Sequence, residues 1–313
     1  MSVRNSLSVV VPVFNSGATV DRLVERLLEV LGRRGQSFEI ILINDGSHDD
    51  GWARIEQAAR RWETVRGIDL MRNYGQHNAL LCGIRAARHE LVVTMDDDLQ
   101  HPPEEIPRLL EALDEGVDVV YGVPARVRHG WLRTAASRLT KLALQNAMGV
   151  QAAADTSAFR AFRTSLREAF ADHQSPFLSI DVLLSWGTTR FAGVEVLHEP
   201  RRAGSSTYSA RALVRHAFNM LTGYSALPLK LATLVGFTFT VLGVGVAVFV
   251  LANYVIGGGG VQGFTFLAAI IAIFAGAQLF AIGIIGEYLA RIHFRVMDRP
   301  TYAIKSRTPD QAT

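Results

Sequence analysis

Short apolar segments alternate with longer amphipathic segments through the first 122 residues of the chain. The short segments are rich in Val, Ile and Leu, and we expect strands at residues 7–14, 38–43, 65–70, 91–95 and 117–122. The segments between them place apolar residues at helical spacing, which predicts helices over residues 19–31, 51–62, 75–88 and 104–110. Thr19 is a suitable N-cap for the first helix. Strict alternation of helices with strands that are apolar on both faces predicts an α/β fold with a mostly parallel sheet.

From residue 123 to residue 208 this alternation breaks down, and the chain becomes basic and rich in loops. The weaker patterns there predict a helix up to about residue 148, a short strand within 155–163, a helix over 177–186 and a strand over 191–198. A basic loop follows and ends at Tyr208. Arginine side chains bind phosphate and carboxylate groups as planar forks, although a surface arginine is as often only solvated.

A long apolar stretch lies near the C-terminus and contains no Asp, Glu, Lys, Arg or His over residues 231–286. It accounts for the positive mean hydropathy of +0.18. The stretch is too long for one membrane span and suits two, which we place at about residues 231–256 and 264–285. A buried helical hairpin in a soluble protein is the alternative.

The charges that flank the two predicted spans indicate their orientation. Lys230 precedes the pair, and three arginines follow it at positions 291, 295 and 299, whereas the turn between the spans carries no charge. By the positive-inside rule, both termini of the chain then face the cytoplasm, and the protein is a multi-pass protein of the cytoplasmic (inner) membrane.

Residues 209–224 combine apolar positions at helical spacing with Arg211 and Arg215. This pattern predicts a helix in the headgroup region of a membrane, and a helix packed on a soluble domain is the alternative. The whole pattern divides the chain into four parts. They are a cytoplasmic α/β domain (1–208), an amphipathic juxtamembrane helix (209–229), two transmembrane helices (230–290) and a cytoplasmic C-terminal tail (291–313).

Composition adds little to this division of the chain. The 313 residues carry a formal net charge of +3 and one cysteine, Cys82. A single cysteine excludes an internal disulfide and fits a reducing compartment, and we expect Cys82 to be a core residue of a helix. No signal-peptide pattern precedes the first predicted strand, so we expect the α/β domain to stay in the cytoplasm.

Polar turns follow three of the predicted strands. Three carboxylates, Asp96-Asp97-Asp98, come directly after the fourth strand, and Asn15 and Asn44-Asp45-Gly46-Ser47 follow the first and second strands. The carboxyl ends of parallel strands line one edge of a sheet, where such folds bind their ligands. Clustered carboxylates repel one another and suit Mg²⁺ or Mn²⁺, especially an ion shared with a diphosphate. A solvated acidic turn is the alternative interpretation.

Two common phosphate-binding motifs are absent from the sequence. No G-x-G-x-x-G follows the first predicted strand, and no P-loop occurs anywhere. The sequence therefore lacks the glycine-rich loop that usually binds a dinucleotide cofactor. The interpretation that remains is a nucleotide held by acidic residues and a metal ion.

The motifs together resemble the family-two glycosyltransferases with a GT-A fold, and more narrowly the polyprenyl-phosphate glycosyltransferases, which include dolichyl-phosphate mannose synthase and the bacterial undecaprenyl-phosphate glucosyl and aminoarabinose transferases. The resemblance rests on Val10-Val11-Pro12-Val13-Phe14-Asn15, Asn44-Asp45-Gly46-Ser47, Arg72-Asn73-Tyr74-Gly75-Gln76 and Asp96-Asp97-Asp98-Leu99-Gln100-His101-Pro102-Pro103-Glu104. It continues through Val119-Val120-Tyr121-Gly122, Arg201 with Gly204, Ser205 and Tyr208, and Gly286-Glu287-Tyr288-Leu289-Ala290-Arg291-Ile292. It covers the chain from about residue 7 to residue 303.

This resemblance implies roles for particular residues. The nucleoside pocket is expected to be lined by Pro12, Val13 and Asn15, with Asp45 bonding the base. Asp96 and Asp98 match the acids of the D-x-D motif, with Asp97 as a spacer; Asp98, with Gln100 nearby, is expected to hold the metal ion, and Asp96 to face the ribose or the metal. The acceptor phosphate is expected to contact Arg126 or Arg128 together with Arg201. Asp155 matches an acid near the sugar, where it orients a hydroxyl or an arginine rather than acting as an obligate base.

Three positions depart from the family pattern. Ser16 follows Asn15 where many relatives have a glutamate, and Asn44 replaces the first acid of the usual Asp-Asp-Gly-Ser. Thr207 stands where a lysine often precedes the tyrosine. These changes affect the expected details of donor and acceptor binding rather than the class of reaction.

The resemblance implies transfer of a sugar from a nucleoside diphosphate sugar (a UDP-sugar in the first place) to a polyprenyl phosphate such as undecaprenyl or decaprenyl phosphate. We expect a single displacement with inversion, because no second carboxylate motif suggests a covalent intermediate. Relatives suggest a homo-oligomer, and no nucleic-acid partner is expected. A processive polysaccharide synthase is an alternative, but no Gln-x-x-Arg-Trp motif follows Asp98. A non-catalytic flippase partner for lipid-linked sugars is the other alternative, although such a protein does not need the acidic strand ends.

Overall fold

The computed structural model describes residues 6–113, 116–124, 156–174, 178–199, 227–257, 263–297 and 299–309. The chain divides into two compact units. The first contains Met1–Leu213 together with Asp298–Thr313, and the second contains Val214–Met297. The predicted helices over 209–224 and up to residue 148 lie outside the described residues.

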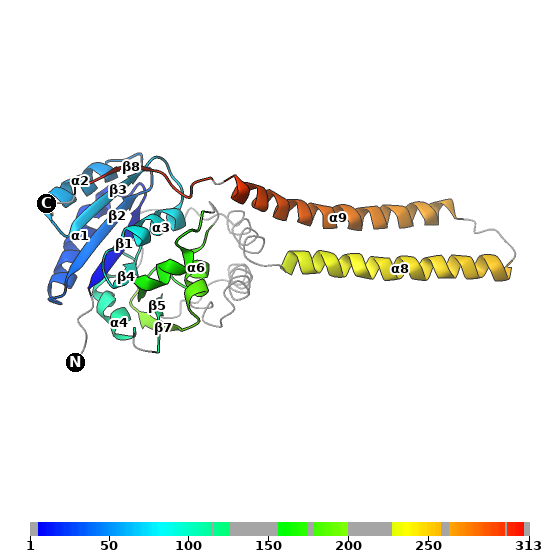
Figure 1. Cartoon of the computed structure of the whole chain (residues 1–313), viewed down its shortest axis with the longest axis horizontal. Helices are drawn as coiled ribbons and strands as arrows, with labels where there is room; N and C mark the ends of the chain where they lie inside the picture. The colour runs from blue at the N-terminus through cyan, green and yellow to red at the C-terminus, as the bar shows by residue number, and fades with distance from the viewer. Residues whose placement is uncertain are drawn as a thin grey trace. The chain divides into compact units, whose positions relative to one another are not determined.

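The described residues of the first unit form an eight-stranded sheet with the order β7-β5-β6-β4-β1-β2-β3-β8 (Figure 1). The strands are β1 (Leu7–Val13), β2 (Phe38–Asn44), β3 (Val65–Leu70), β4 (Leu91–Thr94), β5 (Val119–Pro124), β6 (Arg160–Arg163), β7 (Phe191–Val196) and β8 (Ile304–Arg307). β1 pairs in parallel with β2 and β4, and β2 with β3. β6 and β8 run antiparallel to their neighbours. The predicted α/β fold with a mostly parallel sheet is confirmed.

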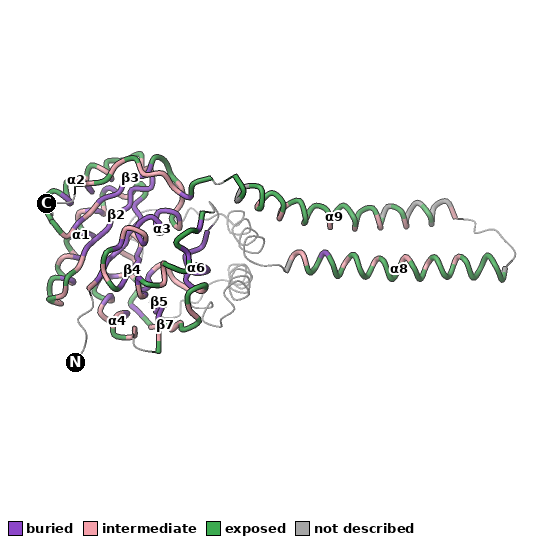
Figure 2. The backbone as a smooth tube through the Cα atoms, viewed as in Figure 1, coloured by how far each residue is buried: buried purple, intermediate pink, exposed green. Residues whose placement is uncertain are grey.

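Helices pack on both faces of this sheet, as the alternation of strand and helix predicts. They are α1 (Gly17–Gly32), α2 (Gly51–Arg61), α3 (Gln76–Ala86), α4 (Ile106–Glu111), preceded by the short η1 (Pro103–Glu105), and α6 (Ile180–Gly187), with η3 (Thr164–Phe170) after β6. Val9 and Val11 of β1 pack in one apolar cluster with residues of α1, α2 and α4. Val10, one residue along, packs in a second cluster with residues of α3 and α6. The strands are therefore buried on both faces, and they appear as the purple interior in Figure 2.

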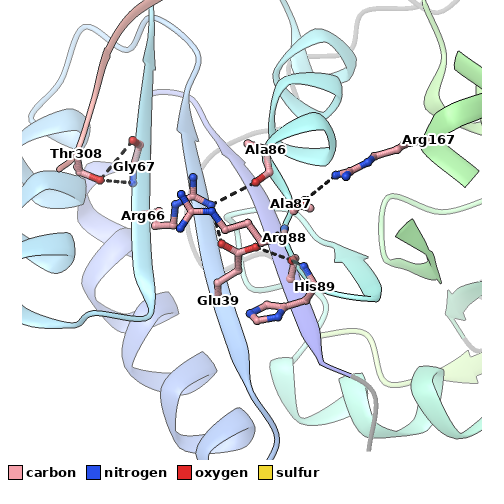
Figure 3. A network of polar contacts seen from close by, with 10 residues as sticks. Glu39, Arg66, Gly67, Ala86, Ala87, Arg88, His89, Arg167 and Thr308 are labelled. Carbon is pink, nitrogen blue, oxygen red and sulfur yellow. Dashed lines mark hydrogen bonds and ion pairs between the residues drawn. The ribbon is translucent and has the colours of Figure 1, made fainter. Parts of the chain in front are cut away.

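A buried carboxylate ties together the amino-terminal ends of the central strands (Figure 3). Glu39 of β2 is 5% exposed. One of its oxygens accepts hydrogen bonds of 2.7 Å from the Ser8 hydroxyl and the Arg88 backbone N–H, and the other pairs with Arg66 Nη1 at 2.7 Å. Arg66 also donates to the Ala86 carbonyl at 3.2 Å. This network lies at the sheet edge opposite to the carboxyl ends of β1, β2 and β4.

Two local predictions are corrected by the structure. Helix α1 begins at Gly17 with Ser16 as its N-cap, so the prediction that Thr19 caps it is wrong. The Thr19 hydroxyl instead donates to the Ser16 carbonyl at 2.8 Å, inside the first turn. Strand β8 was not predicted, because Ile304–Arg307 has no apolar run and carries two charged residues. The residues after the second apolar stretch therefore form an edge strand beside β3.

The second unit contains two long apolar helices, α8 (Leu227–Gly257) and α9 (Phe264–Val296). They pack against each other, and the rings of Phe239 and Phe274 meet edge to face with centroids 5.5 Å apart. Two segments, Pro228–Ile256 and Ile273–His293, are long and apolar enough to cross a membrane. Helix α9 starts where we predicted the second span to begin, and it continues beyond the predicted end at residue 285. The outer surfaces of both helices are largely exposed (Figure 2).

Candidate functional site

A cleft lies at the carboxyl-terminal edge of the central strands. It is lined by residues at the carboxyl end of β1 and in the segments that follow β1, β2, β3 and β4, namely Pro12, Phe14, Asp45, Asn73, Gly75, Gln76, Asp96, Asp97 and Asp98. The parallel pairing of these strands brings their carboxyl ends to one edge, which explains why four separate turns share one cleft.

The turn after β4 holds its carboxylates in different environments. Asp96 Oδ1 accepts a hydrogen bond of 2.5 Å from Gln76 Nε2 at the start of α3. Asp98 Oδ1 accepts one of 3.1 Å from the Gln100 backbone N–H. The turn also places Leu99 at a positive φ of 58°, which is uncommon for a branched residue. This compact turn keeps the carboxylates of Asp96 and Asp98 at the cleft.

Asp97 has a larger role in the turn than that of a spacer. Its Oδ2 accepts a hydrogen bond of 3.3 Å from the Phe14 backbone N–H, so it links the turn after β4 to the turn after β1. Burial raises the pKa of the Asp97 carboxyl from 3.8 to about 6, and the charge of Asp98 adds to this effect, whereas hydrogen bonds from Ser16 and Phe14 oppose it. The anionic form of Asp97 is therefore costly in this site, and a cation nearby would favour it.

Asp45 organises the loop that follows β3. It is 3% exposed, and its two oxygens accept hydrogen bonds from the backbone N–H groups of Tyr74 at 2.7 Å and Gly75 at 2.8 Å. Burial raises the pKa of the Asp45 carboxyl, and the two backbone hydrogen bonds oppose that rise. Each carboxylate oxygen has a second lone pair, so the structure leaves Asp45 able to accept a further bond from a ligand. Its role towards the base stays a prediction.

The turns after β1 and β2 are fixed to each other. The Asn15 backbone N–H donates to Ser47 Oγ at 3.0 Å, and Asn15 Oδ1 accepts from the His48 backbone N–H at 2.8 Å. Asn15 has a positive φ of 52°, which asparagine tolerates better than most residues. Asn15 does not line the cleft itself, and its contacts fix the turn after β1 to the turn after β2. Its role in the nucleoside pocket stays a prediction.

The structure brings some predicted residues to the cleft and places others elsewhere. Pro12, Asp45, Asp96 and Asp98 line it. The side chain of Val13 is fully buried in the core instead, because β1 alternates its side chains between the two faces of the sheet. Asp155 and the predicted acceptor arginines, Arg126, Arg128 and Arg201, lie outside the described residues.

Several lining residues were not predicted to have a role. Phe14, Asn73, Gly75 and Gln76 line the cleft together with Asp97. The residues from 73 to 76 lie in a motif that carried the resemblance, but nothing in a single sequence indicates that they face the turn after β4. That contact depends on the placement of α3 next to β1 and β2.

The turn after β4 also contacts the segment that follows β7. The Gln100 carbonyl accepts a hydrogen bond of 2.8 Å from the Glu199 backbone N–H. The His101 ring stacks on Phe159 and meets the His198 ring edge to face, with centroids 5.3 Å and 5.0 Å away. Burial lowers the pKa of His101 to about 4, so its ring is neutral at physiological pH. Gln100 thus contacts the chain through its backbone, beside the point where the basic loop begins.

The acids at the cleft suit a shared divalent cation better than a cage built only of protein ligands. Within the described residues, no three or more His, Cys, Asp or Glu side chains gather closely enough to hold a metal ion. Mg²⁺ usually binds one or two carboxylates and completes its shell with water and substrate phosphates. Asp96 and Asp98 offer hard oxygen ligands of that kind beside an open cleft.

Comparisons with known proteins agree with this geometry. Residues 8–172 match the family described as glycosyl transferase family 2. An undecaprenyl-phosphate 4-deoxy-4-formamido-L-arabinose transferase of Serratia proteamaculans is 36% identical over 97% of this chain and 94% of its own length. The Pseudomonas aeruginosa protein of the same name is 36% identical over 96% of this chain and 89% of its own length.

The fold also resembles solved structures. Glucosyl-3-phosphoglycerate synthase of Mycobacterium tuberculosis, in complex with phosphoglyceric acid, aligns with a TM-score of 0.54 and 20% identity over 71% of this chain and 80% of that one. The same enzyme with Mn²⁺, UDP-glucose and phosphoglyceric acid aligns with a TM-score of 0.53 and 20% identity, over 70% of this chain and 79% of that one.

Proposed function

Because this chain belongs to glycosyltransferase family 2, we propose that it transfers a sugar from a UDP-sugar to the phosphate of a polyprenyl phosphate at a membrane surface. The observation that carries the proposal is the presence of two features in one chain. An acidic cleft lies at the carboxyl ends of a parallel sheet, and two helices are apolar enough to span a membrane. Relatives that match nearly the whole chain are named as transferases that act on undecaprenyl phosphate, and we take that lipid as the acceptor.

The donor half of the site is the acidic cleft. In this proposal Pro12, Phe14 and Asp45 face the nucleoside, and Asp96 and Asp98 face the diphosphate. A bound Mg²⁺ or Mn²⁺ would neutralise charge on the leaving diphosphate. A structural neighbour that shares this fold was solved with Mn²⁺ and UDP-glucose, which supports a divalent ion and a UDP-sugar as the first donor to test.

The acceptor half is assigned to the basic segment after β7. The contact between Glu199 and Gln100 places Glu199, two positions before Arg201 in the sequence, next to the acidic turn. A phosphate monoester has a second pKa near 6, so the acceptor is already a dianion in large part at neutral pH and needs no strong general base. We therefore propose a single displacement with inversion. The protein's main contribution is to hold two anionic substrates in line, with Arg126, Arg128 and Arg201 on the acceptor phosphate and Asp155 near the sugar.

The fold supports a hairpin that enters and leaves the membrane on one side. The strands before α8 and the strand β8 after α9 belong to one sheet. If α8 and α9 each cross a bilayer, the chain enters and leaves the membrane on the same side. The positive charges after the second span assign that side to the cytoplasm, and the polyprenyl phosphate headgroup would be met there. A homo-oligomer remains an expectation.

The test uses the purified full-length protein with Mn²⁺, undecaprenyl phosphate and a panel of radiolabelled UDP-sugars, with UDP-4-deoxy-4-formamido-L-arabinose first. We expect label to appear in the organic phase, and Asp98→Asn to abolish it while the protein stays folded. Asp172→Asn, a matched change at an exposed acid outside the cleft, should leave the rate unchanged. Full activity of Asp98→Asn would refute the assigned role, and a panel without lipid-linked product would refute the proposal.

A further inference from the structure

We propose that the C-terminal strand β8 supports the donor pocket from outside the cleft, and that Asn44, Asp69 and Lys305 are positioning residues for nucleotide binding. The inference rests on the proposed function, since it assigns these residues to the pocket for the donor nucleotide. None of the three side chains lines the cleft. They act through the loop Asn44–Ser47, which leads from β2 into the cleft.

Asp69 of β3 is the centre of this arrangement. It is 2% exposed, and its two oxygens face different strands. Oδ1 accepts a hydrogen bond of 2.7 Å from Asn44 Nδ2 on the neighbouring strand β2, where Asn44 and Asp69 are paired residues. Oδ2 lies 3.1 Å from Lys305 Nζ of β8. A buried carboxylate needs such partners, because burial without them is costly.

The contact extends from Asp69 into the cleft. Asn44 donates its amide N–H to Asp69, and its Oδ1 accepts a hydrogen bond of 3.3 Å from the Ser47 backbone N–H. The amide nitrogen and the amide oxygen of Asn44 are thus both hydrogen-bonded. The bond to Asp69 therefore sets the orientation of the amide oxygen that accepts from Ser47. Asp45, which lines the cleft, is the next residue along this loop.

Strand β8 is held to β3 by several backbone contacts in addition to the lysine. The Met71 backbone N–H donates to the Ala303 carbonyl at 2.9 Å. Thr308 donates its backbone N–H to the Gly67 carbonyl at 3.0 Å, and its Oγ1 accepts from the Gly67 backbone N–H at 2.9 Å. The β3–β8 pairing also has a register shift between Asp69 and Leu70. The strand is therefore docked independently of Lys305, whose side chain is 61% exposed.

This arrangement explains why asparagine at position 44 suits this chain. An amide nitrogen is a donor and complements the buried carboxylate of Asp69. An aspartate at position 44 would place two carboxylates at hydrogen-bond distance, where they cannot both ionise without strong repulsion. The amide of Asn44 thus complements Asp69, whose other oxygen is paired with the cation that β8 supplies.

The experiment measures UDP affinity by calorimetry and donor KM, acceptor KM and melting temperature in the full-length protein. We expect Asn44→Asp to weaken UDP binding by about tenfold, and Asn44→Asp/Asp69→Asn to recover most of the loss because the donor–acceptor pair is restored in reverse. Lys305→Met should raise the donor KM about threefold and leave the acceptor KM unchanged. Lys305→Arg should retain wild-type values, and Arg307→Met, which removes a cation from the same strand, should do so too.

The outcomes separate the inference from the function on which it rests. A wild-type UDP affinity in Asn44→Asp together with a wild-type donor KM in Lys305→Met would overturn the inference alone. A double variant as weak as Asn44→Asp would overturn the pairing of Asn44 with Asp69. A lower melting temperature with unchanged UDP affinity would show a merely structural contact. A wild-type protein that binds neither UDP nor a UDP-sugar would overturn the proposed function, and the inference with it.

Discussion

Adding a single methyl group at Gly46 should disrupt the proposed donor pocket while the rest of the fold is kept. It lies in the turn after β2 with a φ of +67°. A Cβ added there would lie 2.4 Å from the Arg72 carbonyl carbon and 2.4 Å from the Asn73 backbone nitrogen. Both contacts are with backbone, so no side-chain rotation can relieve them. Gly46→Ala must therefore push the turn after β2 away from the loop after β3.

The size of the effect follows from these contacts. The left-handed conformation costs an alanine about 1 kcal/mol relative to glycine. Ordinary van der Waals contact begins near 3.4 Å, and the difference from 2.4 Å requires a shift of 1.0 Å between the two backbones. Both segments line the cleft, through Asp45 on one side and Asn73 on the other. A displacement of about 1 Å in a binding site can reduce the rate on the order of 100-fold.

Gly35→Ala provides the matched control. Gly35 has a φ of +63°, and a Cβ there would meet no atom within 4 Å. The two variants therefore share the backbone penalty, and only Gly46→Ala adds the steric clash beside the cleft. We expect both variants to lose a little melting temperature from the backbone penalty, and Gly46→Ala to lose more. Gly46→Ala alone should also bind UDP more weakly and lose transfer rate on the order of 100-fold. Equal UDP affinity in the two variants would refute the reasoning.

Three further predictions address the acids and the two ends of the sheet. In metal-free protein, the Asp97 carboxyl binds its proton more tightly when folded than when unfolded, because its pKa rises from 3.8 to about 6. Relative to Asp97→Asn, the wild-type protein should therefore lose stability as the pH rises from 4 to 6, by up to ~3 kcal/mol in denaturant titrations with EDTA. The comparison removes the opposite contribution of His101, which both proteins share. The same pH dependence of stability in both proteins would contradict the assignment. Glu39→Ala removes the buried acceptor of Arg66, the Ser8 hydroxyl and the Arg88 backbone N–H. It should destabilise the protein by about 3 kcal/mol and leave the UDP affinity of the folded protein unchanged. A loss of UDP affinity without a loss of stability would argue against this. A chain that ends at Asp298 retains α8 and α9 but lacks β8, so it should sediment with lipid vesicles and bind UDP weakly; wild-type UDP affinity would show that β8 is dispensable.

The central strands could be predicted from sequence because each is apolar on both faces. Phe38–Asn44 and Leu7–Val13 contain almost no alternation, and the helices between them carry one apolar face each, so the layers follow directly. Parallel strands place their carboxyl ends at one edge of the sheet, so Asp45, Asp96 and Asp98 were expected at one site. The structure shows all three lining one cleft.

The parts that could not be predicted depend on contacts between distant segments. Strand β8 has no apolar run, and it forms only because β3 offers an unpaired edge to it. Nothing in the sequence links Lys305 to Asp69, since the pairing appears only when the tail returns to the sheet. Asp97 was expected to be a spacer because it is the middle residue of the motif, and its contact with Phe14 depends on the parallel pairing of β1 with β4.

The most direct test of the central claim is the fate of the donor phosphorus. Full-length protein with Mn²⁺ and undecaprenyl phosphate is given a UDP-sugar labelled with ³H in the sugar and ³²P in the β-phosphate. If the acceptor phosphate attacks the sugar carbon, the extracted lipid carries ³H and no ³²P, and all ³²P remains in UDP. Lipid that carries both labels would show transfer of a sugar phosphate instead, and ³H released only as free sugar would show hydrolysis; either result would contradict the account.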